Sequence, residues 1–223
     1  MDKELFSTAI KKFVAGVIVV GLLLFVPAGT LAWWQGWLFM GILFVPMFVA
    51  GLIMMRKAPD LLRKRLDAKE DESEQKTVLV LSALMFIAAF VVAGLSVRFG
   101  WIMFPSWVTW IGVVIFLASY ALYAEVMREN AYLSRTVEVQ EGQHVVDTGL
   151  YGIVRHPMYS TTLLLFLSMP IVLGSPFSFI IMLVYVPIIV KRIRNEEEVL
   201  AEGLAGYGEY MTRVKWRLIP HVW

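Results

Sequence analysis

Four apolar runs, each about as long as a bilayer is thick, constrain the fold of this 223-residue chain more than any other feature. They cover roughly Phe13 to Trp33, Gly36 to Met55, Thr77 to Val97 and Trp107 to Tyr123. A helix needs about 20 apolar residues to cross ~30 Å of hydrocarbon, and a spanning segment must satisfy its backbone hydrogen bonds internally. With 59% hydrophobic and 17% charged residues, the chain is predicted to be an all-α, polytopic membrane helical bundle.

A fifth apolar region is interrupted in its middle by Gly174-Ser175-Pro176. Its two arms, Met158 to Leu173 and Phe177 to Val190, hold about 14 to 16 residues, or roughly 21 to 24 Å of helix, which is short for a full span. We therefore predict four full spans followed by a C-terminal helical hairpin. Pro170 and Pro187 lie inside the arms and are expected to bend them.

Lysine and arginine are concentrated in segments that would share one side of the membrane. Nineteen of the 20 lie in the N-terminal segment, the loops after the second and fourth spans, and the C-terminal tail, while Arg98 lies on the opposite side. By the positive-inside rule these segments and both termini are predicted to face the cytoplasm. We expect an integral multi-pass protein of a bacterial or archaeal cytoplasmic membrane.

Three smaller patterns concern the ends of the spans. Pro59 starts a stretch of leucines with arginines and lysines, which fits an interfacial helix or, equally well, a solvated charged linker. From Thr136 to Val146, alternating valines around Glu141-Gly142 predict a short extended hairpin, the only strand expected. An aromatic belt is predicted at the opposite edge from Trp33, Trp34, Trp37, Trp101, Trp107 and Trp110.

Several kinds of chemistry are disfavoured by the composition. Cysteine is absent, which excludes thiolate chemistry and disulfides. The histidines, His144, His156 and His221, lack metal-ligand spacing, so no metal is expected. The glycines do not form GxGxxG after a strand, which argues against a Rossmann site. A net charge of +2 says little about partners, and no nucleic-acid partner is expected.

The segment from Arg155 to Tyr159 places ionisable and aromatic residues at the start of the hairpin. Pro157 holds His156 away from the helical conformation and can occupy the first helical position of the next span. Arg155 and His156 would then lie at a helix N-terminus, whose free amides and partial positive charge suit a carboxylate or phosphate. The alternative is that these residues only mark the membrane boundary and cap the helix.

A second polar cluster ends the hairpin. Lys191, Arg192 and Arg194 are followed by three consecutive acids, Glu196-Glu197-Glu198, within one helical turn. A solvated acidic run is the ordinary interpretation. However, the hairpin begins at Pro157 and returns here, so its topology makes the two clusters neighbours.

Together the two clusters offer what S-adenosylmethionine needs. A cation suits its carboxylate, acidic oxygens suit its sugar hydroxyls or sulfonium, and aromatic rings suit its base. The available aromatic residues are Tyr151, Tyr159 and Tyr207.

The C-terminal 100 residues or so, from Glu129-Asn130 onward, resemble the isoprenylcysteine carboxyl methyltransferase and phospholipid methyltransferase family of integral membrane enzymes. The resemblance rests on Gly149-x-Tyr151-x-x-x-Arg155-His156-Pro157-x-Tyr159, Arg194-x-Glu196-Glu197-x-x-Leu200, Gly206-Tyr207-x-x-Tyr210 and Arg217-Leu218-Ile219-Pro220. No Ser/Gly/Pro linker and no repeat of fixed period divides the chain, so we expect a single membrane domain. The resemblance then implies that residues 1–128 form a helical scaffold and residues 129–223 the catalytic region. It also implies a non-Rossmann S-adenosylmethionine site at the cytoplasmic face, closed by the C-terminal segment and reached by an apolar substrate from the lipid.

The resemblance also implies roles for individual residues. His156, Tyr159 and Glu197 would contact the cofactor, with Glu196 as a nearby support and Pro157 placing His156. Arg155 and Arg194 would orient the acceptor or the cofactor carboxylate, and Glu197 or His156 would take the proton from an amine acceptor. The weaker candidates for the adenosine pocket are Leu150, Tyr151 and Tyr207.

The leading hypothesis is an S-adenosylmethionine-dependent methyltransferase that acts on a lipid, isoprenoid or lipidated, carboxylate-bearing acceptor. The first alternative is a membrane reductase that binds NADPH in a similar cytoplasmic cleft. The second is a non-enzymatic membrane scaffold or transporter subunit. Transport pathways are marked by ionisable residues inside the membrane, and the four clear spans contain essentially none, which argues against transport.

Overall fold

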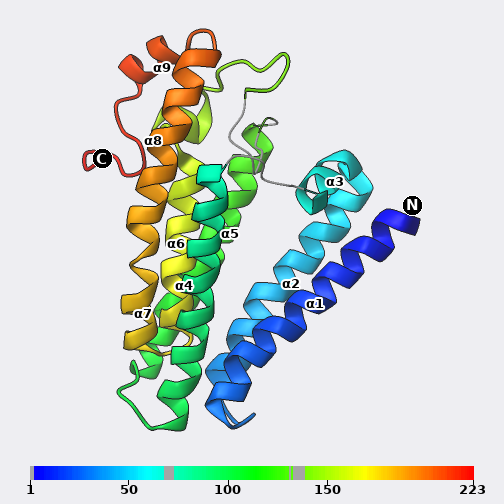
Figure 1. Ribbon diagram of the computed structural model, residues 1–223, viewed down its shortest axis with the longest axis vertical. Coiled ribbons are helices and arrows are strands. Elements are labelled where there is room, and N and C mark those ends of the chain that lie inside the picture. Colours follow the sequence, from blue (N-terminus) through cyan, green and yellow to red (C-terminus); the bar gives the residue numbers. More distant parts are fainter. Residues whose placement is uncertain (1–2, 68–72, 131, 133–138) are drawn as a thin grey trace.

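Long antiparallel helices build the molecule, as the computed structural model shows for residues 3–67, 73–130, 132 and 139–223 (Figure 1). The four predicted spans form α1 (Lys3–Ala28), α2 (Trp34–Lys57), α4 (Ser73–Arg98) and α5 (Ser106–Glu129). Five segments of the described chain are long and apolar enough to cross a membrane: these four and Pro176–Gly203. No strand occurs in the described residues. The predicted all-α membrane bundle is therefore confirmed.

The predicted hairpin is also present. α6 (Pro157–Val172) is one arm, and α7 (Pro176–Met182) with α8 (Tyr185–Gly203) is the other. Between the arms, Gly174 adopts a φ of 78°, which favours glycine, and the Ser175 hydroxyl caps α7 by accepting a bond from the Ser178 amide.

The second arm is bent near Pro187, as predicted, but it ends later than predicted. Proline clashes with the carbonyl four residues earlier, and α7 and α8 are separated by a turn at Leu183 and Val184. We predicted an end at Val190, whereas α8 continues to Gly203 because it becomes amphipathic beyond the apolar stretch. Ile189, Ile193 and Glu197, spaced four residues apart, form its buried row.

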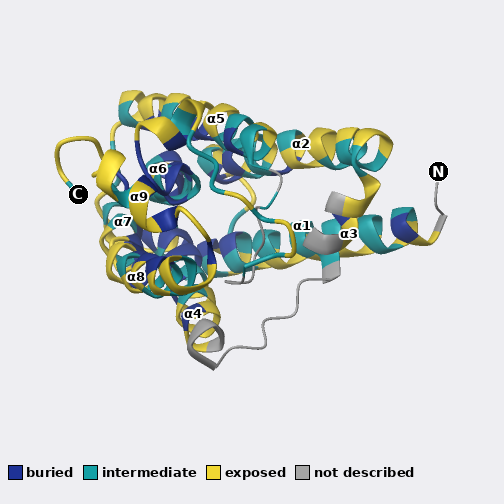
Figure 2. Ribbon diagram, turned by 90° about the horizontal axis from the view of Figure 1, so that it is seen from above, coloured by how far each residue is buried: buried dark blue, intermediate teal, exposed yellow. Residues whose placement is uncertain are grey.

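Small residues let the helices approach closely. A Cβ atom on Gly94 of α4 would lie 2.5 Å from the Leu24 carbonyl oxygen of α1, and one on Gly112 of α5 would lie 2.8 Å from Ile171 of α6. Such close backbone packing is the usual source of helix association in membranes. Seen from above, α6 lies between α5 and the α7–α8 arm, where most buried residues gather (Figure 2).

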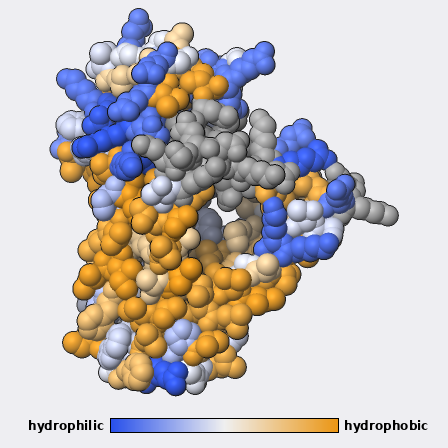
Figure 3. Space-filling view, viewed as in Figure 1, coloured by the Kyte–Doolittle hydropathy of each residue, from blue (hydrophilic) through white to orange (hydrophobic). Residues whose placement is uncertain are grey.

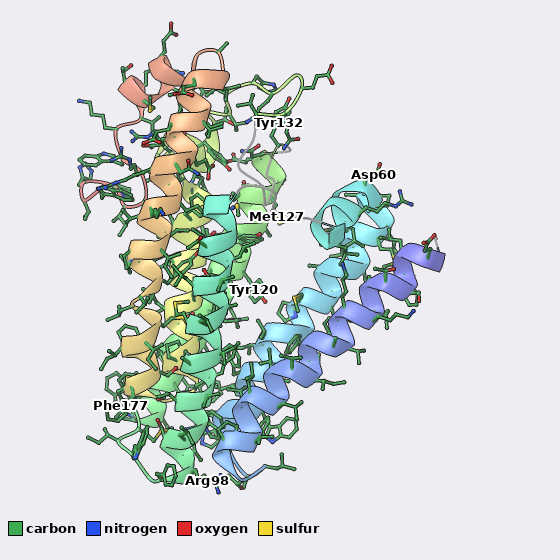
Figure 4. The ribbon with its side chains drawn as sticks, in the orientation of Figure 1. Asp60, Arg98, Tyr120, Met127, Tyr132 and Phe177 are labelled. Carbon is green, nitrogen blue, oxygen red and sulfur yellow. The ribbon has the colours of Figure 1, made fainter. Side chains whose placement is uncertain are left out.

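The two ends of the bundle differ. At one end α1 packs on α4 while α2 contacts α5 and α6, and the pair diverges from the bundle toward the other end. There α3 (Pro59–Asp67) shows that the stretch after Pro59 is a helix, the first of the two alternatives (Figure 1). Both termini lie toward this second end. The tryptophan-bearing loops meet at the first end, where the Trp34 and Trp110 ring centroids are 6.2 Å apart and Arg98 also lies (Figure 4). An apolar band separates the more hydrophilic ends on the face shown in Figure 3.

The predicted extended hairpin from Thr136 to Val146 is not confirmed. Residues 133–138 lie outside the described chain, and residues 139–146 form no strand. The expected turn is present at Glu141-Gly142, where the Gln143 amide donates to the Gln140 carbonyl at 3.0 Å. Val139 and Val145 pack against a cluster that includes Tyr207 and Tyr210 of α9 (Tyr207–Arg213), so these two valines are held by side-chain packing and not by a strand ladder.

We expect Gly94→Ala to destabilise the bundle, because its added methyl would collide with the α1 backbone. Overpacking of this kind typically costs ~1–3 kcal/mol. The matched control is Gly41→Ala in α2, where a Cβ atom meets nothing within 4 Å. Thermal unfolding in detergent should show a lower melting temperature for Gly94→Ala and an unchanged melting temperature for Gly41→Ala. Equal melting temperatures of the two variants would contradict the close packing.

Candidate active site

The loop before α6 is fixed against the C-terminal segment by paired backbone bonds. The Arg155 amide donates to the Trp216 carbonyl at 2.8 Å, and the His156 amide donates to the Arg217 carbonyl at 2.9 Å. His156 has φ −124° and ψ 60°, outside the helical region, and Pro157 occupies the first turn of α6. The local prediction for His156 and Pro157 is therefore confirmed.

The Glu197 carboxylate joins three parts of the chain. Its Oε1 accepts from Arg155 Nε at 2.7 Å and lies 3.1 Å from His156 Nε2, while its Oε2 accepts from Arg217 Nε at 2.7 Å. Glu197 is only 6% exposed. We place the ring proton of His156 on Nε2, because the facing carboxylate can only accept a hydrogen bond. We call this group of four residues, Arg155, His156, Glu197 and Arg217, the Glu197 cluster.

A second polar group lies one residue earlier on α8. The Tyr159 hydroxyl donates to Glu196 Oε2 and accepts from Arg192 Nε at 2.9 Å. Arg192 and Glu196 are four residues apart, so they share one face of α8. This face therefore presents a cation and a carboxylate, and both are bonded to the Tyr159 phenol of α6.

A cavity of about 100 Å³ opens between these groups and the loops around them. Its polar and aromatic lining comes from the end of α5, residues 143–146, the loop before α6, α8 and α9. The lining includes Asn130, Tyr132, His144, Tyr151, Arg155, His156, Met158, Tyr159, Arg192, Glu196, Leu200, Leu204, Tyr207 and Tyr210. Figure 4 shows Tyr132 at this end of the molecule, beyond α5.

Tyr207 contributes a buried hydroxyl to the lining of the cavity. Its side chain is 4% exposed, yet its hydroxyl has no hydrogen-bond partner in the described chain. Buried hydroxyls are normally satisfied, so this one is suited to a ligand in the cavity. Burial, together with the negative charges of Glu197 and Glu196, raises the pKa of the Tyr207 hydroxyl well above its usual range. The group therefore stays protonated and able to donate.

Six of the predicted site residues line the cavity: Tyr151, Arg155, His156, Tyr159, Glu196 and Tyr207. The remaining four do not. Glu197 lies buried behind the wall, Pro157 is buried in the first turn of α6, and the Leu150 amide is bonded to Glu129 Oε2 at 3.0 Å. Arg194 is exposed, because two residues from Glu196 corresponds to about 200° around a helix.

The structure adds lining residues that sequence reasoning missed. Arg192 could have been found from its spacing of four to Glu196. Tyr132 and His144 are joined by a bond of 3.0 Å between the hydroxyl and Nδ1, and Asn130 Nδ2 donates to the Tyr151 hydroxyl at 3.0 Å. Nothing in the local sequence pairs these residues, because the loops that carry them meet only in the folded chain.

We expect Glu197→Ala to lower the free energy of unfolding, because it leaves the Arg155 guanidinium buried without its counter-charge. Removing one partner of a buried pair typically costs ~3–5 kcal/mol. The control is Glu198→Ala, which removes an exposed acid from the next position of the same helix. Melting temperatures in detergent measure both; a similar small effect of the two variants would show that the Glu197 cluster does not stabilise the fold.

Comparison with known proteins identifies the region that carries the cavity. The model of the isoprenylcysteine carboxyl methyltransferase (ICMT) family matches residues 110–202. The Delta(14)-sterol reductase TM7SF2 of Mus musculus is 31% identical over 91 residues, which are 40% of this chain and 22% of that protein. A Delta(14)-sterol reductase of Methylotuvimicrobium alcaliphilum is 25% identical over 137 residues, which are 53% of this chain and 31% of that protein.

The chain thus spans about a fifth to a third of the length of these curated relatives. The family match runs from α5 through α6 to the end of α8, and so it includes the loop at Arg155 and both Glu196 and Glu197. It confirms the resemblance that the motifs indicated: residues 110–202 of this membrane protein match the isoprenylcysteine carboxyl methyltransferase family.

Proposed function

We propose that the protein is an S-adenosylmethionine-dependent methyltransferase that acts at the cytoplasmic membrane face on a lipid, isoprenoid or lipidated acceptor. The observation that carries the proposal is the lining of one cavity: charged residues of both signs come from the family-matched region, and Tyr207, just beyond it, adds a buried hydroxyl without a partner in the described chain. The cavity lies among the segments in which lysine and arginine are concentrated, and this supports the cytoplasmic orientation.

The residues present fit the cofactor group by group. Arg155 and Arg192 offer cations for its carboxylate, and Glu196 offers oxygens for its ammonium or its ribose hydroxyls. The orphaned Tyr207 hydroxyl offers a donor, and Tyr151 offers an aromatic ring. At about 100 Å³ the cavity is smaller than the ~300–1,000 Å³ of typical ligand pockets, so lining side chains must move outward when a nucleoside enters.

The two neighbouring acids take different roles in this proposal. Glu196 faces the cavity and is the acid that contacts the cofactor. Glu197 is a positioning residue, since its carboxylate is already engaged by Arg155, His156 and Arg217 and does not line the cavity. This reverses the roles that the family resemblance implied for the pair.

Bound S-adenosylmethionine would supply an electrophilic methyl group. The chain's residues would hold donor and acceptor in line and keep water out, and such orientation supplies up to ~7–11 kcal/mol in the best intramolecular cases. A carboxylate acceptor needs no base, and Arg155 would orient it. An amine acceptor must lose a proton, and Glu196 is the carboxylate on the cavity wall that can take it.

The curated relatives favour one second candidate, a reductase that takes NADPH in the same cavity. Both are named Delta(14)-sterol reductases. Their matched segments cover only part of each protein, so the likeness supports a shared framework more directly than a shared reaction. The same cations would then face phosphates instead of a single carboxylate.

A binding experiment separates the two candidates. Isothermal titration of the purified protein in detergent should give saturable binding of S-adenosylhomocysteine and none of NADPH. Tyr207→Phe should weaken binding about 2- to 10-fold, the equivalent of one neutral hydrogen bond at ~0.5–1.5 kcal/mol. Glu196→Gln should weaken it more, because it removes a charge, while Glu198→Gln should bind like the wild type. Saturable binding of NADPH without S-adenosylhomocysteine would reject the methyltransferase.

A transfer experiment identifies the acceptor class. Membranes containing the protein, incubated with S-adenosylmethionine labelled on its methyl group, should transfer label to an extractable lipid, and Glu196→Gln should transfer much less. Label released by mild base would indicate a methyl ester and hence a carboxylate acceptor. Label that resists base would indicate a methylated amine, and no labelled lipid or lipoprotein at all would count against transfer to a lipid.

A further inference from the structure

A second cavity lies between α1, α2 and α3, and we propose that it holds one acyl chain of an anionic phospholipid whose headgroup is bound by neighbouring lysines and arginines. The cavity measures about 410 Å³, within the ~300–1,000 Å³ of typical ligand pockets. Its lining residues all lie between Phe6 and Leu66, and none of them lines the candidate active site. The proposal is therefore independent of the proposed function.

The walls of this cavity suit hydrocarbon. Phe13 and Phe48 form an aromatic pair with ring centroids 5.3 Å apart, and Leu62 and Leu66 contribute from α3. Gly51 also lines the cavity, where a Cβ atom would meet nothing within 4 Å. The cavity is open toward its surroundings, and α1 and α2 are candidate membrane spans, so a lipid chain is available to cover its apolar walls.

The position of α3 places the cavity at the level of the headgroups. Leu62 is 5% exposed, whereas Asp60 and Arg63 are exposed and paired with each other at 3.0 Å. An apolar side toward the protein and a charged side outward is the pattern of an interfacial helix. Figure 4 shows Asp60 on this helix, well separated from Tyr132 near the active site.

Charge selects an anionic headgroup over a zwitterionic one. Lys12 lines the cavity and donates to the Leu66 carbonyl, which uses one of the three donors of its ammonium group. Lys11 is adjacent, and Arg56 and Lys57 end α2 close to the start of α3. Basic residues near a membrane surface attract anionic lipid headgroups.

A filled-cavity variant tests the acyl chain. Gly51→Leu should occupy the cavity without a clash, and Gly41→Leu, on the same helix but outside the cavity, is its matched control. Melting temperatures are measured in detergent alone and with added phosphatidylglycerol or phosphatidylcholine. Phosphatidylglycerol should raise the melting temperature of the wild type and of Gly41→Leu, and this rise should fall by at least half in Gly51→Leu. A full rise in Gly51→Leu would overturn the proposal.

A charge variant tests the headgroup and does not depend on the folding of Gly51→Leu. Lys12→Gln should reduce the response to phosphatidylglycerol by at least half, whereas Lys11→Gln, which changes an exposed neighbour outside the cavity, should reduce it less. Native mass spectrometry should count one retained phosphatidylglycerol on the wild type. Equal stabilisation of the wild type by phosphatidylcholine, or equal responses of the two lysine variants, would overturn the proposal.

Discussion

The buried carboxylate of Glu197 is the interaction on which the rest of the site depends. Burying a charge costs several kcal/mol unless it is paired and hydrogen-bonded, and here three donors from two distant segments meet it. Arg155 and His156 come from the loop before α6, and Arg217 comes from the C-terminal segment. One side chain on α8 thus joins the loop before α6, which lines the cavity, to the C-terminal segment.

The electrostatics of the cavity follow from this arrangement. Two guanidinium groups share a single carboxylate, so the Glu197 cluster leaves positive charge beside the cavity. Glu196 returns a negative charge on the exposed side, where it accepts from Tyr159. A wall with both signs suits a ligand that itself carries both signs. The neutral Tyr207 hydroxyl adds a donor whose direction is set by packing.

Sequence reasoning succeeded where local physics decides and failed where packing decides. Apolar run length predicts the spans, because the bilayer sets the length. Pro157 predicts the conformation of His156, because the restriction acts on the preceding residue. The sequence does not decide which of Glu196 and Glu197 faces the cavity. Adjacent helical residues point about 100° apart, so the rotation of α8 decides between them. That rotation is fixed by Ile189 and Ile193, whose spacing places Glu197 on the buried row.

The family match covers only part of the candidate site. The matched residues 110–202 contain the loop at Arg155 and both acids, so they supply the charged frame of the cavity. Tyr207 and Arg217 lie beyond the match. The sterol reductases share only part of their length with this chain. In this protein the Tyr207 hydroxyl is buried, lines the cavity and has no hydrogen-bond partner in the described residues, so it is a donor that a bound ligand can engage.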